Sequence, residues 1–150
     1  MIYVRDLPDQ ALLNWAARIF QDQCNIDALF TLDGGKCHVK AVDRDGEELL
    51  AAVLFHDYIP GVRMEMSIAS VSPKWCNRRV LFECFNYCFN ICDIKRIYTQ
   101  VHGNNEVAKA MNKRLGFNLL AVLPEFQKTR DGEIVETTVF TMTKDQCRWI

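Results

Sequence analysis

Acid–base side chains stand on one face of a predicted strand near the middle of the chain. Residues 62–71 alternate in polarity, with Met64, Met66 and Ile68 on one face and Arg63, Glu65, Ser67 and Ala69 on the other. A carboxylate at such a place can act as a general base, so Glu65 is a first candidate. The alternative is an ordinary exposed glutamate paired with Arg63. His102, which ends the next predicted strand, is a second candidate, with a purely structural histidine as the alternative.

Basic side chains gather where a predicted helix begins. Asn77 is a favoured N-cap residue for a helix over residues 78–92, and Lys74, Arg78 and Arg79 lie beside it. The first turn of a helix offers free backbone N–H groups and a partial positive charge, which bind phosphate readily. This stretch is therefore a candidate anion site. The alternative is that the three cationic side chains are only solvated surface groups.

The elements that position these residues alternate along the chain. The sequence predicts helices over 9–22 (capped by Asp9), 78–92 and 104–115 (ended by Gly116), with strands over 37–42, 48–55, 62–71, 95–101, 117–126 and 135–142; turns or loops are predicted at 33–36, 43–46, 56–61 and 129–132. Strand, helix and strand over 62–101 form a βαβ unit. We expect an α/β (α+β) fold with a mixed sheet, forming one domain over residues 1–150.

Seven cysteines, an odd number without a Cys-x-x-Cys pair, argue for buried thiols. Cys84, Cys88 and Cys92 are spaced four apart and share one helix face with Phe85 and Phe89. The first and third would lie roughly 12 Å apart along the helix, too far to bind one metal ion. The pattern predicts core residues, and a metal or redox role is the alternative.

Composition excludes several classes of function. The 18 basic and 19 acidic residues give a net charge of −1, which argues against general nucleic-acid binding. The chain has no apolar run approaching the ~20 residues that span a membrane, and its N-terminus lacks the apolar stretch of a signal peptide. We therefore expect a cytoplasmic protein. Motifs of serine hydrolases, P-loop enzymes, dinucleotide-binding proteins and zinc sites are absent.

Two stretches resemble the GNAT (GCN5-related N-acetyltransferase) superfamily, especially its branch similar to ribosomal-protein N-acetyltransferases. They are residues 75–81 (WCNRRVL), followed by Phe85, Tyr87 and Phe89, and residues 105–117, where NEVA precedes KRLGF. The second matches the family pattern in which an asparagine stands eleven residues before the glycine. The first also looks like phage-encoded acyltransferase-like proteins. The resemblance covers roughly residues 47–143.

The resemblance implies an acyl-CoA-dependent N-acyltransferase, with acetyl-CoA as co-substrate and an unidentified amine of a protein or small molecule as acceptor. Strands 62–71 and 95–101 would splay apart to admit the cofactor. The implied cofactor contacts are Ala69, Ser70 and Val71 on the first strand, Trp75, Asn77, Arg78, Arg79 and Val80 at the helix start, and Asn105, which would cap the next helix and face the pantetheine. No metal is expected, and a homodimer is left open.

The chain departs from the family pattern at two places. Residues 76–81 contain no glycine, although the family's pyrophosphate loop usually has one or two, and glycine lets the backbone approach phosphate closely. Asn112 stands where many members have a tyrosine acid, and an amide does not supply a proton to a thiolate. Tyr98 or water would have to take that role. The alternative function is a GNAT-fold binding or interaction protein that has lost catalysis.

Overall fold

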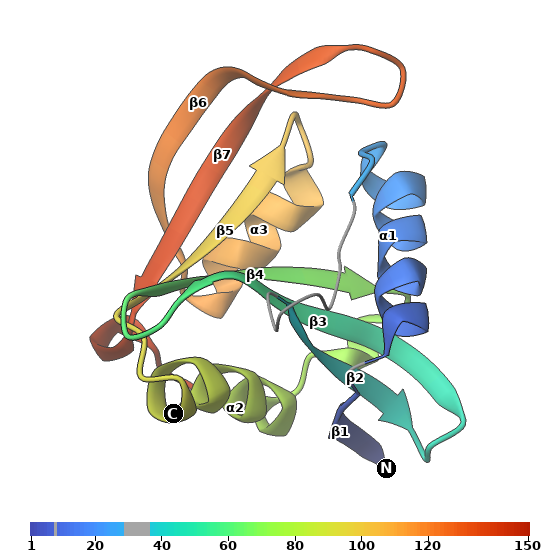
Figure 1. Ribbon diagram of the computed structural model, residues 1–150, viewed down its shortest axis with the longest axis vertical. Helices are drawn as coiled ribbons and strands as arrows, with labels where there is room; N and C mark the ends of the chain where they lie inside the picture. The colour runs from blue at the N-terminus through green and yellow to red at the C-terminus, as the bar shows by residue number, and fades with distance from the viewer. Residues whose placement is uncertain (8, 29–36) are drawn as a thin grey trace.

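A seven-stranded sheet in the order β1-β2-β3-β4-β5-β7-β6 forms the centre of the protein, seen in a computed structural model that describes residues 1–7, 9–28 and 37–150 (Figure 1). The elements are β1 (Ile2–Asp6), α1 (Gln10–Cys24), β2 (His38–Arg44), β3 (Glu48–Ile59), β4 (Arg63–Ser70), η2 (Pro73–Trp75), α2 (Arg78–Asn86), η3 (Tyr87–Ile91), β5 (Arg96–His102), α3 (Glu106–Leu115), β6 (Asn118–Lys128), β7 (Ile134–Thr143) and η4 (Lys144–Gln146). Neighbouring strands are antiparallel, except that β4 and β5 are parallel and joined through α2. The predicted mixed, mostly antiparallel sheet with a central βαβ unit is confirmed.

Two apolar layers cover the two faces of the sheet, as the alternation of β4 predicts. Met64 and Met66 pack in the larger core with α2, whereas Ala69 packs in a smaller core beneath α1. Glu65 and Ser67 share the α1 face with Ala69, because side chains two apart point the same way. The sheet therefore presents the polar face of β4 toward α1.

The predicted helix caps are confirmed. Asp9, Asn77 and Asn105 each accept a hydrogen bond from a backbone N–H of the first turn, at 2.9, 3.0 and 3.2 Å respectively. Gly116 ends α3 with a φ of 99°, the left-handed conformation that glycine adopts without strain. These caps fix where α2 and α3 begin, and both helices follow a strand of the central βαβ region.

Three predictions about the elements need correction. β1 was not predicted; it pairs with β2 as a short edge strand. β3 continues to Ile59 through the predicted loop at 56–61, because His56 and Ile59 pair with β4. The predicted helix 78–92 becomes a π-helix, η3, after Asn86, where the N–H of Cys92 donates to the carbonyl of Tyr87 at 2.8 Å. The turn predicted at 33–36 lies outside the described residues.

The predicted core role of the cysteine stripe is confirmed for Cys84 and Cys88, which are buried, while Cys92 is half-buried against the same core. Burial raises the pKa of the Cys84 thiol to about 12. No helix in the described part of the chain is long and apolar enough to cross a membrane.

Candidate active site

A gap opens between the two parallel strands at the centre of the sheet. β4 and β5 pair only at three positions, from Arg63 opposite Arg96 to Glu65 opposite Tyr98. Beyond them β4 runs on to Ser70 beside β3, and β5 runs on to His102 beside β7. The predicted splay between strands 62–71 and 95–101 is confirmed, and it begins immediately after Glu65.

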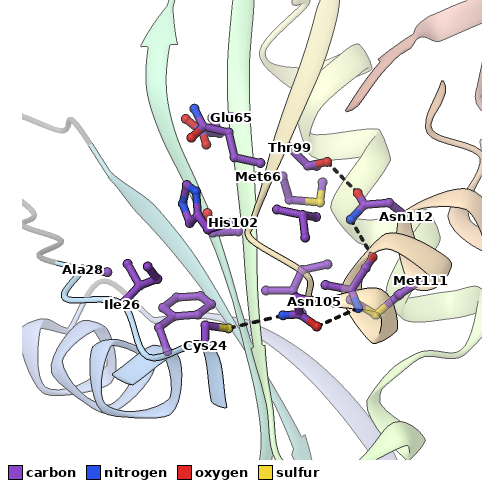
Figure 2. Close-up of a pocket in the computed structure, with 16 residues that line it drawn as sticks. Cys24, Ile26, Ala28, Glu65, Met66, Thr99, His102, Asn105, Met111 and Asn112 are labelled. Atoms are coloured by element: carbon purple, nitrogen blue, oxygen red, sulfur yellow. Dashed lines mark hydrogen bonds between the residues drawn. The ribbon is translucent and has the colours of Figure 1, made fainter. Parts of the chain in front are cut away.

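A cavity of about 150 Å³ occupies this gap and reaches from α1 to α3 (Figure 2). Its lining comes from the α1 end (Phe20, Cys24, Ile26, Ala28), β4 (Glu65, Met66, Ser67, Ile68), β5 (Thr99, Gln100, Val101, His102) and α3 (Asn105, Ala108, Met111, Asn112). The apolar walls with a few polar groups are typical of small-ligand sites. The structure thus brings together Glu65, His102 and Asn105, three of the residues predicted from the sequence.

Glu65 is a largely buried carboxyl at the inner end of the gap. Its side chain is 13% exposed. Burial, a hydrogen bond with Asp57 and the charge of Asp57 together raise its pKa to about 8, with Arg63 opposing them. A pKa near working pH suits a group that takes up and returns a proton. Among described residues Glu65 makes no ion pair with Arg63, so the predicted alternative of an exposed Glu65–Arg63 pair is wrong.

The other two predicted acid–base residues lie differently. His102 lines the cavity, and its Nδ1 is 2.8 Å from the hydroxyl oxygen of Thr137. Burial lowers the pKa of His102, which keeps the imidazole neutral near pH 7. Tyr98 stands opposite Glu65 in the strand register but is not among the described residues that line the cavity. His102 is therefore better placed than Tyr98 to meet a ligand.

Asn112 of α3 and Asn105, the N-cap of that helix, form the opposite wall of the cavity (Figure 2). The Thr99 hydroxyl donates to Asn112 Oδ1 at 2.5 Å, and Asn112 Nδ2 donates to the Ala108 carbonyl at 2.9 Å. Asn105 Nδ2 donates to Cys24 Sγ at 3.7 Å, which ties α3 to α1. Asn112 is thus an anchored structural amide, and Asn105 faces the cavity while capping its helix.

The start of α2 carries the features of an anion site. Arg78 and Arg79 are exposed, and neither forms an ion pair within the described residues. Arg78 lies over the Trp149 ring, 5.8 Å from its centroid. Asn77 Oδ1 accepts from the N–H of Val80, the third residue of the helix. The N–H groups of the first two residues therefore remain for a ligand.

Five further residues that the resemblance implies as cofactor contacts are buried or already bonded within the protein. The side chains of Trp75 and Val80 are buried in the core, so only backbone groups there face a ligand. Ala69 is buried beneath α1. The Ser70 carbonyl accepts from Gln23 Nε2 at 2.9 Å, and the Val71 N–H donates to Leu50 at 2.9 Å. These groups already have protein partners that a pantetheine would have to replace or avoid.

A second, larger cavity of about 740 Å³ adjoins the first. It lies between the end of α1, the β5–α3 connection and the β6–β7 hairpin, and shares Cys24, Ile26, His102 and Asn105 with the first cavity. Its described lining includes two carboxylates and no lysine or arginine; the carboxylates are Glu133 and Glu136. Sequence reasoning missed it, because it depends on the hairpin packing near a helix more than 100 residues earlier.

His56, Asp57 and Glu65 bring one ligand-type atom each within 4.8 Å of one another. Among the described residues, these three come closest to the arrangement of a metal-binding site. The hydrogen bond between the two carboxyl groups already accounts for their approach, so no metal is assigned to them. The absence of a metal, expected from the sequence, stays a prediction.

Comparisons with known proteins identify the fold. No protein-family model and no curated protein sequence matches the chain. Several solved structures do match the fold of the chain. A mutant of the spermidine N-acetyltransferase SpeG from Vibrio cholerae superposes with a TM-score of 0.77 at 15% identity, over 96% of this chain and 94% of that one. The same enzyme in complex with CoA and spermine gives a TM-score of 0.75 at 14% identity, over 97% and 96%.

A plant structure gives the same result. Arabidopsis thaliana NAA60 in complex with a bisubstrate analogue matches with a TM-score of 0.74 at 17% identity, covering 95% of this chain and 98% of that one. Identities this low establish architecture rather than chemistry. The splayed parallel strands, the capped helix after each of them and these superpositions agree, and the chain has the GNAT fold.

Proposed function

We propose that this protein is an acyl-CoA-dependent N-acyltransferase, with acetyl-CoA as donor and an amine as acceptor. The observation that carries the proposal is the cavity in the β4–β5 gap, which begins at a buried carboxyl with a pKa near 8. A thioester held in that gap would lie within reach of Glu65 and His102. The similarity to N-acetyltransferase structures, one of them with CoA bound, supports the same assignment.

The donor would bind along the gap toward the start of α2. Free N–H groups and the helix dipole there favour the pyrophosphate, and the Arg78 and Arg79 side chains add positive charge. Because the loop has no glycine, we expect these side chains to carry more of the phosphate contact than the backbone does. The pantetheine would pass Asn105 and place the acyl group in the cavity.

The reaction would proceed by direct transfer. The neutral amine nitrogen attacks the thioester carbonyl carbon, a C–N bond forms and the C–S bond breaks. Glu65, as a carboxylate, takes the proton that the amine loses, and the CoA thiolate finally takes up one proton. The carboxyl of Glu65 provides a place to hold that proton between the two steps.

The acceptor would enter from the second cavity. The two carboxylates of its described lining, Glu133 and Glu136, favour an amine that carries additional positive charge. Spermidine, the substrate named for the similar Vibrio cholerae enzyme, belongs to this chemical class. We therefore propose a diamine, a polyamine or a basic peptide as acceptor.

Three broader expectations accompany this function. We propose that residues 1–150 act as one catalytic domain and that the protein works in the cytoplasm, as the composition suggests. A homodimer also stays a proposal. The edge strand β6 exposes Leu119, Leu120, Val122 and Phe126, which suits pairing with a second copy.

A two-part assay tests the function. Purified protein is titrated with acetyl-CoA in a thermal-shift experiment, and CoA thiol release is then measured with diamines, polyamines and basic peptides. We expect a raised melting temperature and amine-dependent thiol release that Glu65→Gln reduces by about 10²-fold or more. Binding without release for any amine would favour the alternative, a binding protein that has lost catalysis. If acetyl-CoA does not bind and no thiol is released with any amine, the proposal is refuted.

A further inference from the structure

We propose that Asp57, a residue outside the cavity, is a positioning residue that sets the protonation state of Glu65 and equips that one carboxyl to serve as both base and acid. The kinetic part of this inference rests on the proposed function; the carboxyl pair itself does not. Asp57 does not line the cavity, so it would act only through Glu65.

Strand geometry brings the two carboxyl groups together. His56 on β3 pairs directly with Glu65 on β4, and the register then shifts before Ile59. Asp57 lies in this shift with a φ of 49°, in the left-handed region that non-glycine residues rarely adopt. Irregular positions of this kind re-aim a side chain relative to a regular strand. Here an oxygen atom of the Asp57 carboxyl lies within 4.8 Å of one of Glu65 across the strand pair, and the two carboxyl groups share a hydrogen bond.

Unequal exposure decides which carboxyl keeps the proton. The Glu65 side chain is 13% exposed and that of Asp57 is 64% exposed. Water stabilises the charge on Asp57, whereas burial destabilises a charge on Glu65. The hydrogen bond from Glu65 holds the pKa of Asp57 below its usual range, and burial with the Asp57 charge raises the pKa of Glu65 to about 8.

The other groups around the pair do not cancel this effect. His56 Nδ1 lies 3.4 Å from Asp57 Oδ2 and 3.8 Å from Glu65 Oε2, while its Nε2 lies 2.8 Å from the Ser67 hydroxyl oxygen. Burial lowers the pKa of His56, so the ring is neutral near pH 7. The positive charge of Arg63 on β4 lowers the pKa of Glu65, but its effect is smaller than that of burial and Asp57.

Three further titratable groups face Glu65 from the elements around it. Tyr98 stands opposite it on β5, His102 lies further along the same strand, and Cys24 comes from α1 across the cavity. Burial keeps the imidazole of His102 neutral and the thiol of Cys24 protonated near pH 7, through a lowered and a raised pKa respectively. Neither His102 nor Cys24 therefore brings a charge that offsets Asp57 at that pH.

This arrangement compensates for the missing tyrosine acid. Asn112, at the expected tyrosine position, is anchored by hydrogen bonds and supplies no proton. Glu65 as carboxylate takes the proton of the attacking amine and, as carboxylic acid, passes it to the departing thiolate. A thiol has an ordinary pKa of about 8.5, so a carboxyl near 8 is closely matched to it. One side chain thus completes a proton cycle that starts and ends with the carboxylate.

Asp57→Asn separates charge from shape. Asparagine has nearly the same size, accepts hydrogen bonds and tolerates a left-handed φ, so the strand pair should keep its fold. Asp93→Asn is the matched control, because Asp93 is also exposed with a positive φ, 51°, and is not among the charged groups that act on Glu65.

The test is a carbon-detected NMR titration of the Glu65 carboxyl in the wild type and both variants, beside turnover measured from pH 6 to 9. We expect half-titration near pH 8 in the wild type, a midpoint lower by about one pH unit or more in Asp57→Asn, and no change in Asp93→Asn. The acid limb of the turnover profile should move with the midpoint. Equal midpoints in wild type and Asp57→Asn would overturn the inference. If no amine is acylated, the proposed function fails, and the NMR titration still decides the role of Asp57.

Discussion

The buried carboxyl of Glu65 should make the stability of the folded protein depend on pH. In the unfolded chain this group has its ordinary pKa of 4.5, and in the folded protein burial and the Asp57 carboxylate raise the pKa to about 8. Between these values the folded state holds a proton that the unfolded state has released. The free energy of unfolding must then fall as the pH rises through this window.

The magnitude follows from the two pKa values. At about 1.4 kcal/mol per pH unit, the interval from 4.5 to about 8 corresponds to at most about 5 kcal/mol. The Glu65 side chain is 13% exposed, so solvent screens little of this effect. Glu65→Gln replaces the acid by a neutral amide of similar shape and removes the dependence. The variant should thus gain stability relative to the wild type as the pH increases from 5 to 9.

Urea unfolding of both proteins at pH 5, 6, 7, 8 and 9 measures this difference. The lowered pKa values of His56 and His102 have the opposite effect, since they destabilise the folded state as the pH falls below about 6.5. Both histidines are neutral near pH 7, so the comparison between pH 7 and 9 is free of their contribution. A constant difference between wild type and variant across the whole range would refute the assignment of a raised pKa to Glu65.

Three other predictions follow from the site and the core. Replacing Arg78 and Arg79 by alanine should weaken acetyl-CoA binding by about tenfold or more per good phosphate contact, measured by calorimetry; unchanged affinity would show that they are not ligands. Asn112→Ala should lower the free energy of unfolding in urea by about 1–3 kcal/mol, because a buried hydroxyl loses its acceptor; wild-type stability would contradict the anchoring role. Cys76 is exposed and Cys88 is buried, so mass-spectrometric mapping of the native protein should find that a thiol reagent modifies Cys76 much faster than Cys88. Equal rates would contradict the core packing.

Local chemistry made much of the site predictable from the sequence. Strand side chains alternate strictly, so the position of Glu65 on the polar face of β4 followed from the residues on either side of it. Asparagine side chains cap helices through a hydrogen bond within one turn, so Asn77 marked the start of α2 without tertiary information, whereas the cap at Asn105 came from the family resemblance. The splay between β4 and β5 came from the family resemblance rather than from periodicity.

Long-range contacts account for what the sequence did not predict. The stretch containing Asp57 and Pro60-Gly61 is typical of a loop, yet pairing with β4 extends β3 through it. Its role depends on the approach of Asp57 to a residue on the next strand. The second cavity likewise depends on the β6–β7 hairpin meeting the end of α1, where Asn25 Nδ2 donates to Asp131 Oδ2 at 2.7 Å. No local pattern records such a contact.

Transfer of the acetyl group itself tests the central claim most directly. The protein is incubated at pH 8 with acetyl-CoA carrying a deuterated acetyl group and with a diamine, and the products are analysed by mass spectrometry. We predict one labelled acetyl group on the amine for each free CoA formed, at a rate that Glu65→Gln lowers by about 10²-fold or more. The contrary result is that acetyl-CoA binds but no diamine, polyamine or basic peptide becomes labelled. That result would contradict the claim that this chain catalyses acyl transfer.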